Sequence, residues 1–206
     1  MAEIRPEQLY SSPDVLEQVL GGLMSDSTDV IKTAEKITNA FSKKVDCIAP
    51  LIQQIQQSGN AGVRLQAAIL LKRKIGKLYN KLDPTGKANV HAALLNLCMA
   101  QLDAKVGTQV AGALAVIVLK VFKNKGAQWP EFFELLAALQ NGDNSKKALL
   151  FELLEQCPTP LEGYMESLSN LLGEGCVSPD MKLAMKAMKA TASFMEEFGS
   201  KASAMH

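Results

Sequence analysis

The residues that could bind a metal ion are four cysteines and two histidines, and they lie far apart in the sequence. No two cysteines form a C-x-x-C pair, and neither histidine lies at the spacing of a zinc ligand. Zinc sites are built from closely spaced Cys and His residues, so this pattern does not predict one. We interpret the cysteines as reduced and mostly buried thiols, which suits a cytosolic or nuclear compartment: Cys47, Cys98, Cys157 and Cys176.

The sequence also lacks the residue patterns that carry catalysis. Gly107 and Gly112 have the spacing of the first half of a phosphate-binding loop, but Ala-Leu follows where that loop needs Lys and Ser or Thr. G-x-S-x-G and H-E-x-x-H signatures and a Cys–His nucleophile pair are missing. Carboxylate pairs such as Glu131 and Glu134 have helical spacing and are typical of a charged helix surface. We therefore expect a protein that is not an enzyme and needs no cofactor.

Charge is unevenly distributed along a chain that is nearly neutral, with 22 basic and 21 acidic residues. Residues 32–87 hold 11 basic and 3 acidic side chains, whereas residues 126–176 hold 8 acidic and 2 basic ones. A basic segment can attract nucleic acid or an acidic protein. Tyr79 is the one aromatic residue in the basic cluster 64–81, which disfavours base stacking. We interpret the cluster as a solvated face that complements the acidic half or an acidic partner.

The elements that position these charges are predicted to be helices. Apolar residues recur at i, i+3, i+4 and i+7 between short polar or Gly/Pro-containing breaks. The content of 48% hydrophobic and 5% aromatic residues, with a mean hydropathy of +0.05, is that of a globular all-α protein rather than a β-sandwich. Ten helices are expected, near 14–24, 29–42, 45–57, 61–80, 86–101, 104–123, 129–140, 144–157, 160–173 and 179–198.

Short connections join these helices into expected hairpins near 14–42, 45–80, 86–123, 129–157 and 160–198. The second helix of each carries an apolar triplet: Val30/Ala34/Ile37, Val63/Ala67/Leu70, Val106/Val110/Ala113, a weaker Asn144/Ala148/Phe151, and Met181/Met185/Met188. The triplets recur roughly every 38 residues, in the range of HEAT and armadillo repeats. Because one hairpin cannot bury both of its apolar stripes, neighbours stack and share them. We predict a right-handed all-α solenoid of about five HEAT-type hairpins, with a compact helical bundle as the alternative.

Methionine is concentrated near the C-terminal end, where six of the nine methionines lie from Met165 onward. They make the last expected helix apolar over more than one stripe. This pattern indicates either ordinary core packing or a face on which a further repeat stacks, because a terminal repeat normally has a polar outer face. An exposed Met-rich face would be adhesive or bind a partner.

Membrane and secretory segments are not expected. The N-terminal sequence MAEIRPEQLY has no apolar h-region, so no signal peptide is predicted. The most apolar run, residues 110–119, is half of the roughly 20 residues that a membrane span needs. A buried helix explains this run better, and we expect an intracellular soluble protein.

The stretch VRLQAAILLKRKIGKLYNKLD, residues 63–83, resembles the second HEAT repeat of nuclear transport receptors of the importin-β (karyopherin-β) family. The family pattern V-R-x-x-A-x-x-x-L-[KR]-x-x-I, followed by an aromatic residue, is matched by Val63, Arg64, Ala67, Leu71, Lys72, Ile75 and Tyr79. DSTDVIKTAEKITNAF resembles the first repeat of the family, and AQWPEFFELLAALQNGD resembles the helix start that follows its third repeat. The order of these segments is most similar to the importin-4 branch, and the likeness covers nearly the whole chain.

The resemblance implies a nuclear transport receptor, or its N-terminal portion, that works in the cytoplasm and nucleus. Receptors of this family bind the GTP-loaded form of the GTPase Ran through the second helices of their first three repeats. The candidates here are polar residues between the core positions: Lys32, Glu35, Lys36, Asn39, Arg64, Lys72, Arg73, Lys105 and Gln109. Basic protein cargo is a further implied partner, which the acidic half could hold through Glu152, Glu155 and Glu162.

Two features depart from the family pattern. Family members are several times longer, so most cargo-binding and pore-binding repeats would be missing. The Asp/Arg ladder of many HEAT proteins is expected to be absent, because Arg64 alone lies in its register. Two alternatives therefore stay open: a HEAT-repeat scaffold or adaptor without Ran dependence, and a HEAT-fold nucleic-acid-binding protein that uses the cluster 64–81. Salt-sensitive binding to DNA or RNA would distinguish the second.

Overall fold

The computed structural model describes residues 4–123 and 128–203, where the regular elements are α-helices and short 3₁₀ helices, with no strand. Each predicted helix is present, and the differences lie at the ends. The helix expected from residue 160 begins at Met165, because Thr159–Tyr164 forms a 3₁₀ helix. The α-helices are α1 (Pro13–Gly22), α2 (Thr28–Phe41), α3 (Ile48–Gln57), α4 (Ala61–Leu78), α5 (Pro84–Met99), α6 (Ala104–Phe122), α7 (Pro130–Gln140), α8 (Asn144–Gln156), α9 (Met165–Cys176) and α10 (Met181–Ser203).

Side-chain caps determine where several of these helices begin. Asn60, Asp83 and Asp143 precede α4, α5 and α8, and each accepts a hydrogen bond at 2.7–2.9 Å from a backbone N–H in the first turn. Asp180 does the same for α10 at 3.0 Å. Each cap satisfies an N–H group that has no partner within its helix, which stabilises the start by about 1 kcal/mol.

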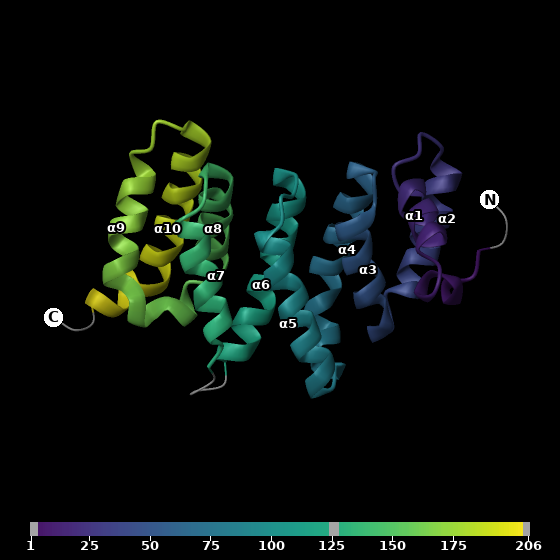
Figure 1. Cartoon of the computed structure of the whole chain (residues 1–206), viewed down its shortest axis with the longest axis horizontal. Helices are drawn as coiled ribbons and strands as arrows, with labels where there is room; N and C mark the ends of the chain where they lie inside the picture. The colour runs from purple at the N-terminus through teal and green to yellow at the C-terminus, as the bar shows by residue number, and fades with distance from the viewer. Residues whose placement is uncertain (1–3, 124–127, 204–206) are drawn as a thin grey trace. The chain divides into compact units, whose positions relative to one another are not determined.

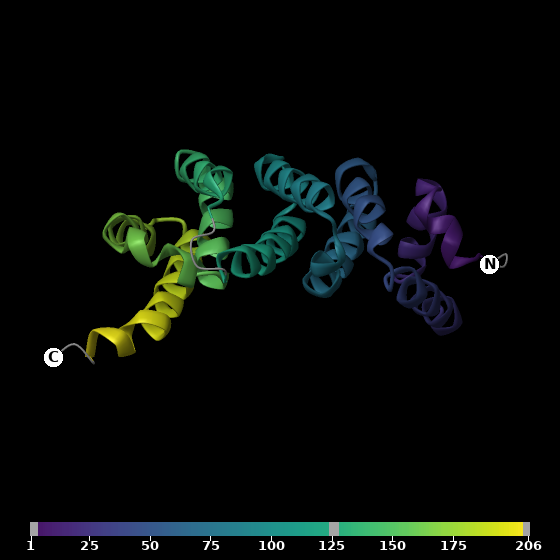
Figure 2. The ribbon, with the colours of Figure 1, turned by 90° about the horizontal axis from the view of Figure 1, so that it is seen from below.

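The chain forms two compact units, residues 1–113 and 114–206. In the first unit, α1, α3 and α5 lie in one layer, and α2 and α4 lie in a second layer (Figures 1 and 2). Contacts join α1 to α2 and α3 to α4, and also join α1 to α3 and α4. Side chains from both layers form the core, which includes the fully buried residues Leu16, Leu51, Ile55, Leu71 and Ile75.

In the second unit, α10 packs against both α8 and α9, and α7 packs against α8 (Figure 1). Phe151 of α8 is buried where these helices meet. A Cβ atom placed on Gly175 of α9 would lie 2.7 Å from the Cβ of Ala187 on α10 and also against the ring of Phe151. The three helices therefore approach closely at a position where glycine alone leaves room.

The predicted apolar triplets are buried in the first three second helices, apart from half-buried Val30. In α2, α4 and α6, the first residue of the triplet is the third residue of the helix. The third residues of α8 and α10 are Lys146 and Leu183, and each lies two positions after the first residue of the predicted triplet. Triplets that start at these residues continue with Leu150 and Leu153 in α8, and with Ala187 and Ala190 in α10. All four of these residues are buried.

The predicted triplet of α10 was therefore wrong as a core stripe. Met181, Met185 and Met188 are 77%, 55% and 54% exposed, and Met195 is 69% exposed. The physical reason is that α10 is apolar on two sides, and the side with the small Ala187 packs inward, where it allows the close approach to Gly175. Of the two interpretations of the Met-rich helix, the exposed face is the one observed.

α6 is the one helix in the described part of the chain that is long and apolar enough to cross a membrane. In the structure, 56% of this stretch is buried inside the protein. A core helix passes the same test, and this burial agrees with the prediction of a buried helix. Its fully buried side chains include Val110, Leu114 and Ile117.

The cysteines are placed as the sequence predicted. Cys47, Cys98 and Cys157 are buried, Cys176 is half-buried, and none of the four forms a disulfide. Burial raises the pKa of Cys47 to about 12 and that of Cys157 to about 12. Both thiols are therefore protonated and unreactive at neutral pH.

Replacing Gly175 with alanine should destabilise the second unit. The added methyl group would overlap the buried Phe151 ring and Ala187, which cannot move away cheaply, so we expect a loss of about 1–3 kcal/mol. Gly173→Ala is the matched control on α9, because no atom lies within 4 Å of its Cβ position. Alanine should there stabilise the helix by up to about 1 kcal/mol. Chemical denaturation measures both, and equal effects would contradict the close packing at Gly175.

Candidate interaction surface

The predicted polar residues of α2 form a single exposed stripe. Lys32, Glu35, Lys36 and Asn39 are all exposed and follow the spacing i, i+3, i+4 and i+7. Buried residues such as Ile37 occupy the opposite side of the helix. The arrangement leaves two ammonium groups, a carboxylate and an amide available to a partner.

Arg64 of α4 is engaged within the protein. Its Nη2 atom lies 2.7 Å from Oδ2 of Asp103, and its Nη1 atom donates a hydrogen bond at 2.8 Å to the carbonyl oxygen of Ser58. This pair is a single Arg–Asp contact between two hairpins, and the absence of a continuous ladder stays a prediction. Helical spacing did not identify Asp103 as the partner of Arg64, because Asp103 precedes α6 and does not lie within a helix. The pair joins the start of α4 to the start of α6, which assigns Arg64 a structural role.

Lys72 of α4 lies across α6. A Cβ atom on Gly112 would lie 2.5 Å from Nζ of Lys72, so the lysine side chain occupies the space that glycine leaves open. Lys72 is half-buried as a result. Sequence reasoning considered Gly112 as part of a failed phosphate-binding loop and gave it no role. The structure shows that Gly112 accommodates the Lys72 side chain.

The other cations of the basic cluster point in different directions, as helical spacing predicts. Arg73 and Lys77 are exposed. Lys74 is half-buried and lies near Cys47, where its positive charge lowers the thiol pKa against the larger opposing effect of burial. Lys72 is therefore the cation of α4 that lies against α6, and Arg73 is exposed at the next position of the helix.

α6 adds two more predicted residues. Lys105 is exposed and Gln109 is half-buried, and both lie on the same side of the helix as Gly112. We define the second-helix face as Lys32, Glu35, Lys36 and Asn39 of α2, Lys72 and Arg73 of α4, and Lys105 and Gln109 of α6. The face can bind a partner by charge and hydrogen bonding. The residues that the structure describes include no cluster able to hold a metal ion.

The three acidic cargo candidates of the second unit differ in how exposed their side chains are. Glu152 of α8 forms an ion pair with Lys186 of α10 and accepts a hydrogen bond at 2.8 Å from Gln156. It therefore links two helices. Glu155 is half-buried and Glu162 is exposed. Glu152 therefore has a structural role in the second unit.

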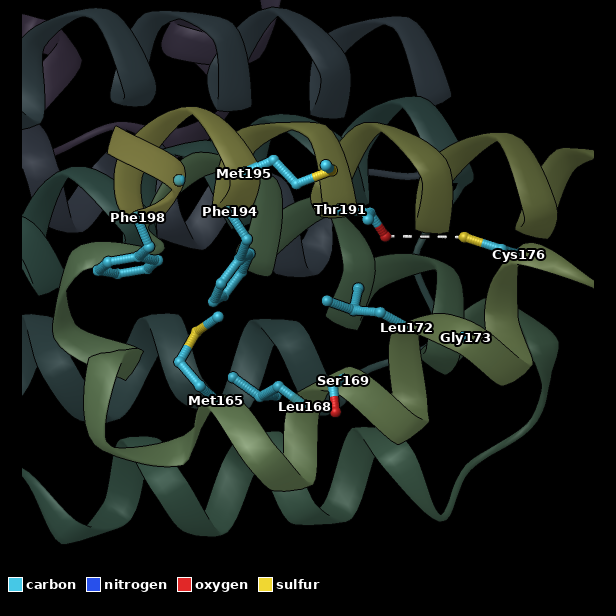
Figure 3. Close-up of a pocket in the computed structure, with 11 residues that line it drawn as sticks. Met165, Leu168, Ser169, Leu172, Gly173, Cys176, Thr191, Phe194, Met195 and Phe198 are labelled. Atoms are coloured by element: carbon cyan, nitrogen blue, oxygen red, sulfur yellow. Dashed lines mark hydrogen bonds between the residues drawn. The ribbon is translucent and has the colours of Figure 1, made fainter. Parts of the chain in front are cut away.

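An apolar groove of about 430 Å³ lies between α9 and α10 (Figure 3). Cys176 and Thr191 meet at one end, with Sγ 3.6 Å from Oγ1. The groove walls are mainly methionine, leucine and phenylalanine side chains: Met165, Leu168 and Leu172 of α9, and Phe194, Met195 and Phe198 of α10. Sequence reasoning identified the methionines and phenylalanines of α10 but did not predict a groove.

Solved structures with the same fold define the class of protein as an α-solenoid. Kap121p bound to RanGTP has a TM-score of 0.74 and 17% identity, covering 93% of this chain and 18% of its own. Kap121p bound to Ste12p has a TM-score of 0.76 and 17% identity, covering 94% of this chain and 19% of its own. The predicted fold class is confirmed.

Sequence comparison identifies the family. Residues 102–206 match the family model described as "IPO5-like, TPR repeats". Mouse importin-4 is 23% identical over 168 residues, a match that covers 79% of this chain and 15% of that protein. The chain belongs to the importin-β family of transport receptors, as its sequence predicted. It spans less than a fifth of the length of these relatives.

The contact between Lys72 and Gly112 can be tested by combining two substitutions. In a Lys72→Ala background, Gly112→Ala should stabilise the protein by about 1 kcal/mol, because alanine favours the helix. With Lys72 present, the methyl group displaces the lysine side chain and this gain should be lost. Urea denaturation of the four proteins gives the coupling energy, expected at about 0.5–2 kcal/mol. An equal effect of Gly112→Ala in both backgrounds would show that the two residues do not interact.

Proposed function

We propose that this chain binds the GTP-bound form of Ran through the second-helix face and takes part in protein import into the nucleus. The observation that carries the proposal is the shared fold with Kap121p, which has been solved in complex with RanGTP and whose match covers 93% of this chain. The chain acts in this proposal as a binding protein without catalysis or cofactor. It works in both cytoplasm and nucleus.

The charge of the second-helix face supports this proposal. The face carries five cations and one carboxylate, and most of these side chains are exposed. Such a basic excess attracts an acidic partner surface and speeds its association. Exposed positions on three successive second helices also provide an extended contact area, which a specific protein complex needs.

The structure also supports a division of roles among the candidates. Lys72 is held against Gly112, so binding costs less side-chain entropy than it would for a free lysine. Arg73 is exposed beside it and can form paired hydrogen bonds with a carboxylate. Arg64 acts indirectly, because its ion pair with Asp103 fixes α4 relative to the start of α6.

The test is the affinity of the chain for Ran loaded with GTP and with GDP. We expect clear preference for the GTP form and at least about a 10-fold weaker complex for the Lys72→Ala/Arg73→Ala variant. The control variant Lys43→Ala/Lys81→Ala removes the same charge at exposed positions outside the second-helix face. It should bind nearly as well as the unmodified chain. Equal affinity for both nucleotide states would instead support a HEAT scaffold without Ran dependence.

We further propose that basic protein cargo contacts the acidic part of the second unit. Kap121p has been solved with two bound proteins, Pho4p and Ste12p. Glu155→Gln/Glu162→Gln should weaken binding of a basic peptide and reduce its dependence on salt, as calorimetry at two ionic strengths can measure. Glu152 is left unchanged because it pairs with Lys186. Unaltered binding by the double variant would contradict this cargo site.

A further inference from the structure

Polar contacts within the first unit connect its three successive hairpins. Ser58, which follows α3, donates a hydrogen bond at 2.9 Å from its hydroxyl to Oε1 of Glu17 on α1. The carbonyl oxygen of Ser58 accepts the hydrogen bond from Arg64 of α4, and Arg64 pairs with Asp103 before α6. We call these four residues the polar network. It runs from α1 to the start of α6 through Ser58.

Ser58 is the centre of the polar network. Its Oγ atom also accepts a hydrogen bond at 3.1 Å from the backbone N–H of Asn60, the residue that caps α4. Its own backbone N–H donates at 3.1 Å to the carbonyl oxygen of Gln54. Every polar atom of Ser58 therefore has a partner, and the residue is 7% exposed. Moving it would break several hydrogen bonds at once, so its position is well defined.

A second contact fixes the register between α1 and α3. Gln54 donates a hydrogen bond at 2.7 Å from Nε2 to the carbonyl oxygen of Pro13. Pro13 lies about one helical turn before Glu17 on α1, and Gln54 lies about one turn before Ser58. Sliding one helix along the other would break both contacts and leave buried polar groups without partners. The first hairpin is thus held at a defined height against the second.

The polar network also orients the side chain of Arg64. An ion pair between exposed side chains usually contributes little, because both side chains must be ordered to form it. Here the Ser58 carbonyl oxygen holds Nη1 of the guanidinium, while Nη2 lies 2.7 Å from Oδ2 of Asp103. The contact between α4 and the start of α6 therefore depends on Ser58, which Glu17 holds in turn.

We propose that Glu17 and Ser58 are positioning residues for the second-helix face. They hold the three hairpins in fixed relative positions, so that α2, α4 and α6 present their polar side chains together. A face that is ordered before binding loses less conformational entropy when a partner docks. This inference rests on the proposed binding to Ran, and it adds two residues outside the face that determine the affinity.

The polar network can be tested without Ran, by measuring whether its two ends are coupled. Glu17 and Asp103 bond to different partners, so substitutions there act independently on unfolding unless the network links them. The effect of Glu17→Met/Asp103→Ala on the unfolding equilibrium constant should differ at least about 3-fold from the product of the two single effects. In a Ser58→Ala background this difference should vanish. Urea denaturation measures each variant, and independent effects with Ser58 present would overturn the network.

The affinity for Ran tests the positioning role. Ser58→Ala and Glu17→Met should each weaken binding of GTP-loaded Ran by about 3- to 10-fold, with unchanged circular dichroism. Glu17→Gln is the conservative variant, because its amide oxygen can still accept the hydrogen bond from Ser58. It should bind within about 2-fold of the unmodified chain. Glu7→Met is the control, since it removes the same charge from an exposed residue of the first unit, and it should leave the affinity unchanged.

Hydrogen exchange of the free chain locates the effect of these variants. In Glu17→Met, exchange should become faster in the N-terminal halves of α4 and α6, which the polar network connects to α1. Glu17→Gln should exchange like the unmodified chain. Faster exchange confined to α1 would contradict the coupling between hairpins.

Failure of this inference can be distinguished from failure of the proposed function. Equal loss of Ran affinity in Glu17→Met and Glu17→Gln, or loss in neither, would overturn the positioning role while Ran binding by the unmodified chain stands. If the unmodified chain shows no preference for GTP-loaded Ran, the proposed function falls and the positioning role falls with it. The urea measurements then still decide whether the polar network couples the three hairpins.

Discussion

The burial of each hairpin's apolar surface by its neighbour is the constraint on which the rest of this structure depends. A pair of helices can cover one apolar stripe of each member, and the remaining stripes need another hairpin. Phe151 shows how this works, because it extends from α8 into the space beside Gly175 and Ala187. The side chain is 1% exposed, which no single hairpin could achieve. The same requirement leaves α10 with an apolar face that the chain itself does not cover.

Glycine determines where the helices come closest. Gly175 makes room for an apolar ring, and Gly112 makes room for the side chain of Lys72. The two contacts have opposite consequences. The first closes a core in the second unit, whereas the second fixes the direction of a cation on the second-helix face. A packing constraint thus also prepares the surface that we propose for binding.

Much of the fold could be predicted because helical periodicity is a local property of the sequence. Each expected helix was found, and the burial of most apolar stripes was correct. The core stripe of α10 was missed because the helix is apolar on two sides, and apolar spacing does not show which side packs inward. In α8 the burial of Phe151 was predicted correctly, whereas Asn144 and Ala148 are not fully buried. The pair between Arg64 and Asp103 was missed for a different reason. Its partners are brought together by the stacking of hairpins, which no local pattern records.

The candidate site was predictable in part for the same reason. Exposed positions on α2 follow directly from helical spacing, so Lys32 and Lys36 were placed correctly on the surface. The residues of α4 were harder to assign, because Arg64 and Lys72 both interact with neighbouring parts of the chain. The polar character of a side chain does not show whether it connects two helices of the chain or is exposed for binding to another protein. Contacts between hairpins make that distinction.

Hydrogen exchange of the chain with and without GTP-loaded Ran tests the central claim most directly. The account predicts slower exchange in α2, α4 and the first half of α6 when Ran is bound, and unchanged exchange in α9 and α10. GDP-loaded Ran should produce no such protection at the same concentration. Protection confined to α9 and α10, or the same protection with either nucleotide, would contradict the assignment of the second-helix face as the Ran-binding surface.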